Sequence, residues 1–365
     1  MSQSQSLSRQ VRIPMRRWSS RTTNVDNTSV IEMSKSLSRS SPFPSGKSKG
    51  QYMIQDDHLV EKVIDSLRIR STDTVLELGG GNGSITSRLL PISKDVISIE
   101  NDARFMNENM KRCRDLGFSS VRHIQCDALK MEYPRFDVCV SNLPFSLSAP
   151  LLIKLVKHRP LWRSCVLIVQ REFADALIAD PGERNYSRLS MNMSLFFRTE
   201  RVARINGASF YPVTPVEAAL IRLDPRNPPP AFDFDEWNAV VKACFIEKKT
   251  NLRRAFTRPS MVKLLEVNYK SFCSFHQHPT SPLPFSQYLQ AAITDSGLSH
   301  YCAKQLPPDA IEHLLETLHL RGIYFTTLPS RVDKQLVGMT TPTIPETVVP
   351  EIPTLVDQFA IPVVS

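Results

Sequence analysis

Short strand-like segments alternate with amphipathic helical segments between residues 74 and 170, and no other feature limits the possible folds as strongly. The strand-like segments are rich in β-branched residues, as buried strands of parallel sheets are. They cover 74–78, 95–100, 121–126, 136–140 and 165–170. The alternation predicts an α/β domain in which helices cover both faces of a parallel sheet.

The pattern changes after residue 226, where the prolines of "NPPPAFDFDEW" interrupt the chain. A chain of 365 residues accommodates roughly two to three domains. Helix-like segments follow at 236–248, 259–268 and 307–320. We therefore expect an α/β domain over 50–225 and a smaller, mostly helical domain over 226–330.

Both ends of the chain have the composition of disordered segments. Residues 1–49 hold nine lysines and arginines against two acidic residues, a net charge of +7, and residues 331–365 contain five prolines. The basic segment predicts contact with an anionic partner such as RNA. A solvated tail explains it equally, and the absence of acidic residues from the first 25 positions also suits a mitochondrial presequence.

The seven cysteines occur singly, at 113, 126, 139, 165, 244, 273 and 302. An odd number without any C-x-x-C pair argues for reduced thiols in an intracellular protein, and against a zinc site or a disulfide framework. No uninterrupted apolar run reaches about 18 residues, so we expect no membrane-spanning helix.

A glycine-rich turn, "VLELGGGNGSIT" at 75–86, follows the first strand-like segment and precedes a helical one. Gly79, Gly81 and Gly83 permit a tight turn and a close approach of the main chain to a ligand. The free N–H groups at the start of the following helix add hydrogen-bond donors. The spacing differs from the dinucleotide-binding G-x-G-x-x-G pattern, and a purely structural turn is the alternative interpretation.

Acidic residues stand at or near the ends of three successive strand-like segments: Glu77, Glu100 and Asp127. Open α/β sheets bind ligands at the carboxyl edge, where these ends meet. Glu100 is expected to accept hydrogen bonds from both hydroxyls of a ribose, and Asp127 from the amino group of an adenine. Each acid alone would be a surface residue or a helix cap. No G-K-[ST] phosphate-binding sequence is present, so S-adenosylmethionine suits the pattern better than NAD or ATP.

The fourth strand-like segment ends in "SNLPF", which places an amide, a proline and an aromatic ring in close succession. The exocyclic amine of adenine is a poor nucleophile because its lone pair is delocalised into the ring. The side-chain oxygen of Asn142 and the carbonyl of Leu143 are suited to accept hydrogen bonds from that amine and so localise the pair. Pro144 stiffens the turn, and Phe145 is suited to stack on the base. The alternative is an ordinary turn after a strand.

Together these segments resemble the small-subunit ribosomal RNA adenine dimethyltransferases, the KsgA-type family and its eukaryotic nucleolar branch. "LELGGGNG" resembles the first motif of the family, with Gly80 where a proline is usual, and "NLPF" resembles its catalytic N-L-P-[YF]. "GQYMI" at 50–54 is similar to its glycine–glutamine opening. The residues that the resemblance implies for cofactor binding are Gln51, Met53, Glu77, Gly79, Gly81, Gly83, Glu100, Asp127 and Asn142.

"FYPVTPVEAALIRL" at 210–223 resembles the F-x-P-x-x-V segment of the family, whose phenylalanine lines the pocket for the target base. The resemblance implies a base pocket that includes Phe145 and Phe210. It also implies that the catalytic residues are Asn142, Leu143, Pro144 and Phe145. The segment departs from the family pattern at Thr214, Pro215 and Ala218.

The resemblance implies a Rossmann-like class I methyltransferase domain that dimethylates N6 of two adjacent adenines in the 3′-terminal loop of the small-subunit rRNA. It also implies a nucleolar protein, expected to be monomeric, that binds the pre-ribosomal small subunit and takes part in its biogenesis. Two alternatives are an assembly or RNA-binding factor with dispensable methylation, and a mitochondrial relative acting on rRNA or in transcription. Candidate RNA contacts, or else parts of a solvated helix face, are Lys248, Lys249, Arg253 and Arg254.

Overall fold

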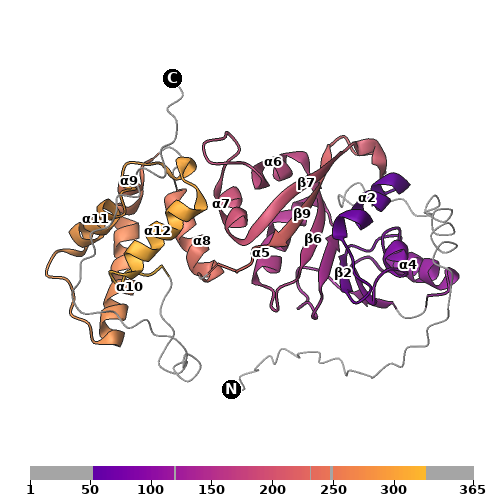
Figure 1. Ribbon diagram of the computed structural model, residues 1–365, viewed down its shortest axis with the longest axis horizontal. Coiled ribbons are helices and arrows are strands. Elements are labelled where there is room, and N and C mark those ends of the chain that lie inside the picture. The colour runs from indigo at the N-terminus through magenta and orange to yellow at the C-terminus, as the bar shows by residue number, and fades with distance from the viewer. Residues whose placement is uncertain (1–51, 119–120, 231, 247–249, 326–365) are drawn as a thin grey trace, which may run out of the picture.

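The structure is a computed structural model, and it describes residues 52–118, 121–230, 232–246 and 250–325. The predicted tails 1–49 and 331–365 lie outside the described residues, as does Gln51. A seven-stranded sheet forms the centre of the larger part of the molecule (Figure 1).

The strand order of this sheet is β4-β3-β2-β5-β6-β9-β7. The strands are β2 (Thr74–Leu78), β3 (Asp95–Glu100), β4 (Arg122–Gln125), β5 (Val138–Ser141), β6 (Ser164–Gln170), β7 (Phe197–Ile205) and β9 (Ala218–Pro225). The five strands that the sequence predicts, β2 to β6, are parallel to one another. The expected parallel sheet is nevertheless mixed, because β9 lies antiparallel to both β6 and β7. The chain between β7 and β9 forms no α-helix that would bring it back in a parallel sense, so it returns in the opposite direction.

Helices cover both faces of the sheet, as predicted. Alternate residues of β2 point to opposite faces, so Val75 belongs to one hydrophobic cluster while Leu76 belongs to another. The first cluster includes the apolar side of α2 (Asp57–Leu67), and the second includes that of α5 (Ser148–Lys157). The remaining helices of this part are α3 (Thr86–Leu89), α4 (Ala103–Asp115), α6 (Arg171–Leu177) and α7 (Arg188–Phe196).

A two-residue strand pair connects the start of the described chain to a segment more than 150 residues further on. β1 (Met53–Ile54) runs antiparallel to β8 (Phe210–Tyr211), with Met53 opposite Tyr211 and Ile54 opposite Phe210. The main-chain N–H of Gln55 donates to Ser209 O at 3.0 Å, and its side chain donates to the carbonyl of Ala208 at 3.1 Å. This pairing holds the N-terminal segment against the domain beside β5.

The described chain beyond β9 is mostly helical, in agreement with the predicted change of pattern. Its helices are α8 (Phe234–Cys244), α9 (Leu252–Phe256), α10 (Pro259–His276), α11 (Phe285–Asp295) and α12 (Pro308–His319). α8 has the start that a helix needs, because the Asp233 carboxylate accepts hydrogen bonds from the N–H groups of Asp235 and Glu236. None of the described helices is long and apolar enough to cross a membrane.

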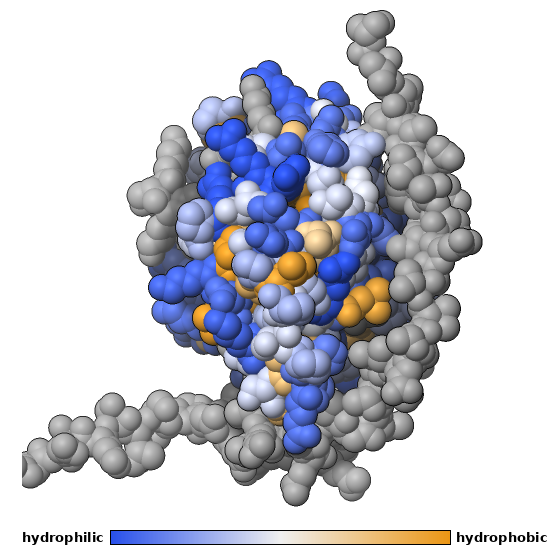
Figure 2. Space-filling model, turned by 90° about the vertical axis from the view of Figure 1, so that its left-hand side faces the viewer, coloured by the Kyte–Doolittle hydropathy of each residue, from blue (hydrophilic) through white to orange (hydrophobic). Residues whose placement is uncertain are grey.

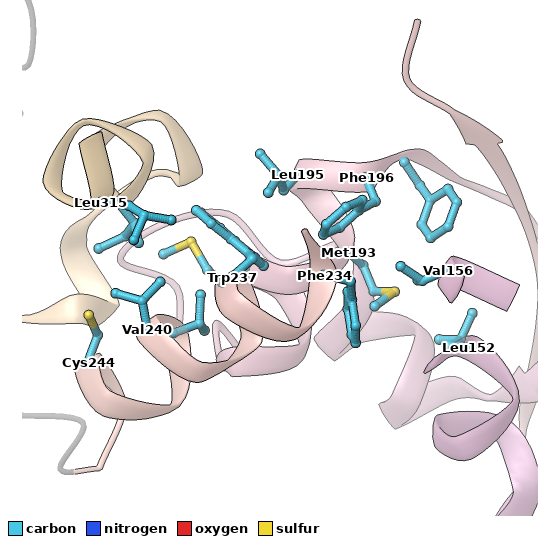
Figure 3. Close-up of a cluster of buried hydrophobic side chains, with 14 of the residues drawn as sticks. Leu152, Val156, Met193, Leu195, Phe196, Phe234, Trp237, Val240, Cys244 and Leu315 are labelled. Carbon is cyan, nitrogen blue, oxygen red and sulfur yellow. The ribbon is translucent and has the colours of Figure 1, made fainter. Parts of the chain in front are cut away.

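The helical part and the sheet share one hydrophobic core (Figure 3). Trp237 of α8 is completely buried, and Phe234 meets Phe196 edge to face with ring centroids 5.5 Å apart. The same cluster continues from α5 through α7 and α8 to Leu315 of α12. The proline segment at 228–230 therefore marks a change of secondary structure and not a break in the core.

Candidate active site

A cavity of about 170 Å³ opens at the carboxyl edge of the sheet. It is built mainly from residues that directly follow the ends of β2, β3, β4 and β5, together with the first described residues of the chain. The predicted site residues that line it are Met53, Gly79, Gly81, Glu100, Asp127, Asn142, Leu143 and Pro144. The structure thus brings eight residues from five separate segments to one place.

The glycine turn forms one wall of this cavity. Gly79, Gly81 and Gly83 have φ angles of +82°, +52° and +80°, a region that other residues rarely adopt. A Cβ atom on Gly79 would lie 3.0 Å from the carbonyl oxygen of Asn142, so the turn packs directly against the segment after β5. Gly83 does not line the cavity, because it packs against Asn109 of α4. Its predicted contact with the cofactor is therefore corrected to a role in shaping the turn.

Two carboxylates lie on the cavity wall. Glu100 accepts hydrogen bonds from the main-chain N–H groups of Gly81, at 3.0 Å, and Asp102, at 2.9 Å, so its orientation is fixed. Each of its oxygens retains acceptor capacity for a hydroxyl group. Asp127 accepts from the N–H of Leu129 at 2.9 Å. This arrangement matches the acceptors that the ribose and the adenine of a nucleoside need.

Glu77 does not line the cavity, which corrects its predicted contact with the cofactor. Glu77 lies in β2 beneath the glycine turn, where it pairs with Ser98 of β3, and it is only 2% exposed. Its Oε2 accepts hydrogen bonds from the hydroxyls of Thr86, at 2.5 Å, and Ser98, at 2.7 Å, while Oε1 has no hydrogen-bond partner. Burial, which disfavours the charged form, raises the pKa of Glu77 to about 7. Glu77 therefore supports the turn from within.

The same buried network explains the glycine at position 80. A Cβ atom there would lie 2.2 Å from Ser98 Oγ and 2.8 Å from Asn109 Nδ2. Asn109 in turn donates to Thr86 Oγ1 at 2.8 Å. These polar side chains occupy the volume that a larger residue at position 80 would need.

Asn142, Leu143 and Pro144, which directly follow β5, line the cavity. The Asn142 N–H donates to Leu78 O, and its side-chain Nδ2 donates to Tyr52 O, both at 3.1 Å. With Nδ2 engaged, Oδ1 is the acceptor that Asn142 retains. Pro144 begins a short 3₁₀ turn over Phe145–Leu147, closed by a hydrogen bond from Leu147 N–H to Pro144 O at 2.9 Å. Phe145, predicted as a base-stacking residue, does not itself line the cavity; its half-buried ring packs on the cluster around α2 and stacks on the ring of Tyr52, which does line it.

Phe210 does not face the cavity, so its predicted place in a base pocket is wrong for this structure. Its side chain is completely buried in the cluster around α2, and so is its strand partner Ile54. Because successive strand residues point to opposite faces, Met53 and Tyr211 point the other way. Met53 lines the cavity, and the ring of Tyr211 is substantially exposed.

The candidate RNA contacts lie elsewhere. Arg253 and Arg254 are exposed on α9, in the helical part of the molecule and away from the sheet edge (Figure 1). The face formed by the helical part is largely hydrophilic, with small apolar patches (Figure 2). Lys248 and Lys249 lie outside the described residues. Within the described residues, no group of three or more His, Cys, Asp or Glu is placed to hold a metal ion, and all seven cysteines are free.

Sequence reasoning missed Tyr52, which contacts both Asn142 and Phe145. It stands within the "GQYMI" segment, between the two residues that the resemblance indicated for cofactor binding. Nothing in the local pattern shows that its carbonyl meets the amide of a residue 90 positions further on. Leu147 and Phe105 also line the cavity and were not predicted.

The fold and the cavity define a class I S-adenosylmethionine-dependent methyltransferase. A glycine turn with positive φ angles and two carboxylates at successive strand ends fit the ribose and adenine of that cofactor. Among the described residues that line the cavity there is no lysine or arginine that would bind a phosphate chain. S-Adenosylmethionine is the methyl donor.

Comparison with known proteins defines the family. The family described as "Ribosomal RNA adenine dimethylase" matches residues 45–274. A probable dimethyladenosine transferase of Caenorhabditis elegans is 35% identical over 285 residues, covering 78% of this chain and 92% of the relative. A ribosomal RNA small subunit methyltransferase of Arabidopsis thaliana is 39% identical over 226 residues, or 62% of this chain and 64% of the relative. The crystal structure of a dimethyladenosine transferase from Plasmodium falciparum matches with a TM-score of 0.73 and 34% identity, covering 75% of this chain and 100% of that chain.

The chain therefore belongs to the ribosomal RNA adenine dimethylase family. It is an S-adenosylmethionine-dependent adenine N6-dimethyltransferase that acts on rRNA.

Proposed function

We propose that the enzyme dimethylates two adjacent adenines in the 3′-terminal loop of the small-subunit rRNA and takes part in small-subunit biogenesis. The proposal extends the family activity, and the Arabidopsis relative, which is named for the small subunit, supports it. A base in a helix cannot bring N6 into a cavity, so the target adenines must lie in a loop or be flipped out.

The observation that carries the mechanism is the hydrogen bond from Asn142 Nδ2 to Tyr52 O at 3.1 Å. It leaves Oδ1 as the acceptor of the Asn142 side chain, and both Asn142 and Leu143 line the cavity. Two acceptors aimed at the N6 amine favour a pyramidal nitrogen with a localised lone pair. Phe145 stacks on the base and restrains its orientation, so positioning supplies most of the rate.

S-Adenosylmethionine, when bound, supplies an electrophilic sulfonium methyl group. Glu100 would hold the ribose hydroxyls of the cofactor, and Asp127 would hold its adenine amine. No general base is needed before attack, because the amine that accepts a methyl group becomes acidic and afterwards releases its proton to solvent water. Asn142 Oδ1 and the Leu143 carbonyl remain hydrogen-bonded to the amine as it loses that proton.

The RNA contacts, the oligomeric state and the subcellular location of the enzyme are also proposed. We infer that Arg253 and Arg254 contact rRNA phosphates, because both are exposed cations on one short helix. We also propose that the enzyme is monomeric and nucleolar, with a mitochondrial location as the alternative. A fluorescent reporter fused to residues 1–49 tests the location, and a purely mitochondrial signal would overturn the nucleolar proposal.

Methyl transfer from labelled cofactor to purified immature small subunits tests the substrate. The wild type and Asn142→Ala are compared, large subunits serve as the control substrate, and the labelled nucleosides are mapped by nuclease protection. We expect dimethyladenosine at two adjacent adenines of the small-subunit 3′-terminal loop, from the wild type alone. Label in large-subunit RNA, or at a single adenine elsewhere in the small subunit, would overturn the proposal.

A further inference from the structure

Tyr52 contacts both side chains to which the mechanism gives a role at the target base. Its carbonyl accepts the hydrogen bond from Asn142 Nδ2 at 3.1 Å. Its ring stacks on the ring of Phe145, with centroids 6.0 Å apart and an angle of 28° between the planes. It also lines the cavity beside Asn142 and Pro144.

The main chain at Tyr52 is itself held in place. The next two residues form β1, which pairs with β8. The pairing is extended by one hydrogen bond, from Gln55 N–H after β1 to the carbonyl of Ser209 before β8. Ile54 and Phe210 anchor this pair in the buried core. A carbonyl one residue before such an anchor has a defined position, so it is suited to orient an amide side chain.

Phe145 needs support of this kind. It begins a 3₁₀ turn of three residues that leads into α5, and its ring packs only at the edge of the cluster around α2. Its ring is only half-buried, and within the described residues Tyr52 is the aromatic ring stacked on it. Tyr52 lines the cavity and Phe145 does not, so the ring of Tyr52 connects the Phe145 ring to the cavity where the target base would enter.

We propose that Tyr52 is a positioning residue for methyl transfer, which orients the Asn142 amide with its carbonyl and supports the Phe145 ring with its own ring. The proposal rests on the roles proposed for Asn142 and Phe145. Tyr52 takes no part in bond making, and its effect reaches the reacting nitrogen through those two residues.

The alternative is that Tyr52 acts on the cofactor, because it lines the same cavity. The two roles differ in what they change. A residue that positions Phe145 alters kcat and the KM for RNA, whereas a cofactor contact alters the dissociation constant for S-adenosylmethionine. They also differ in whether the effect of Tyr52 depends on the presence of the Phe145 ring.

A double-mutant cycle on the full-length enzyme separates them. The variants are Tyr52→Ala, Phe145→Ala and the double variant, with Tyr52→Phe as the matched control that removes only the hydroxyl. Initial rates of methyl transfer to immature small subunits are measured, together with the cofactor dissociation constant and the melting temperature. Tyr52→Leu, which keeps apolar bulk without an aromatic face, replaces Tyr52→Ala if that variant folds poorly.

We expect Tyr52→Ala to lower kcat/KM for RNA about tenfold, with the cofactor dissociation constant unchanged, and Tyr52→Phe to match the wild type. In the Phe145→Ala background the Tyr52 substitution should have no further effect. Equal losses in both backgrounds, or a loss confined to cofactor binding, would overturn the proposal for Tyr52. Full activity of Phe145→Ala would instead refute the proposed role of Phe145 itself.

Discussion

The buried carboxyl of Glu77 makes a specific prediction about how stability depends on pH. Burial raises its pKa from an ordinary value of 4.5 to about 7. The folded protein therefore keeps the proton over a pH range in which the unfolded chain has released it. Stability from this group is fully present below pH 4.5, falls as the pH rises towards 7, and is lost above that value.

The size of the effect follows from the shift. One pKa unit corresponds to 1.36 kcal/mol, so a shift of this size lowers the free energy of unfolding by about 3 kcal/mol between pH 4.5 and pH 8. The side chain introduced by Glu77→Gln cannot ionise, so the free energy of unfolding of this variant should not fall in the same way. Its amide oxygen can still accept from the hydroxyls of Thr86 and Ser98, while its NH₂ group takes the place of the oxygen that has no partner. The free-energy cost of burying that NH₂ group without a partner is the same at every pH.

Urea unfolding measures the effect. The fluorescence of Trp162 and Trp237, both buried, reports the transition at pH 5, 6, 7 and 8. We expect the wild type to lose about 2.5 kcal/mol relative to Glu77→Gln from pH 5 to pH 8. Glu132→Gln, which removes an exposed carboxyl, is the control. The same pH dependence in the wild type and in Glu77→Gln would refute the reasoning.

Four further predictions concern the site and the core. Asn142→Ala should lower kcat at least about 100-fold with cofactor binding retained, because one of the two acceptors at N6 is lost; calorimetry and initial rates decide, and near-normal turnover would contradict it. Phe145→Ala should raise the KM for RNA while Phe145→Tyr is tolerated, as steady-state kinetics would show; equal kinetics would exclude stacking. Gly80→Ala should weaken cofactor binding about tenfold in a titration, since its Cβ would lie 2.2 Å from Ser98 Oγ. Trp237→Ala should cost about 3–5 kcal/mol and leave one unfolding transition; two separate calorimetric transitions would show independent domains.

Much of the sheet and part of the site follow from local signals in the sequence. The five parallel strands are short apolar runs, and the residues after each run meet at one edge because parallel strands end together. Glu100, Asp127 and Asn142 therefore lie where they were predicted. β7 was not predicted, because exposed charged residues such as Arg198 and Arg204 interrupt its apolar pattern.

Apart from the antiparallel β9, two of the wrong predictions concern the direction in which a side chain points. Phe210 and Tyr211 are neighbours in the chain, and a shift of one residue in strand register would exchange the buried ring for the exposed one. The pairing of β8 with β1 decides between them, and its partner lies more than 150 residues away. Glu77 was misplaced for a similar reason, since its pairing with Ser98 puts it beneath the glycine turn instead of at the strand end. Local pattern carries no information on either pairing.

The site joins cofactor binding and base binding through main-chain contacts. The Asn142 N–H donates to Leu78 O, directly before the glycine turn, and a Cβ on Gly79 would lie 3.0 Å from Asn142 O. A displacement of the glycine turn therefore displaces the segment proposed to hold the target amine. On its other side the same segment depends on Tyr52, which β1 and β8 hold in place. The position of Asn142 is thus set from both sides by main-chain groups, and this accuracy is what catalysis by positioning requires.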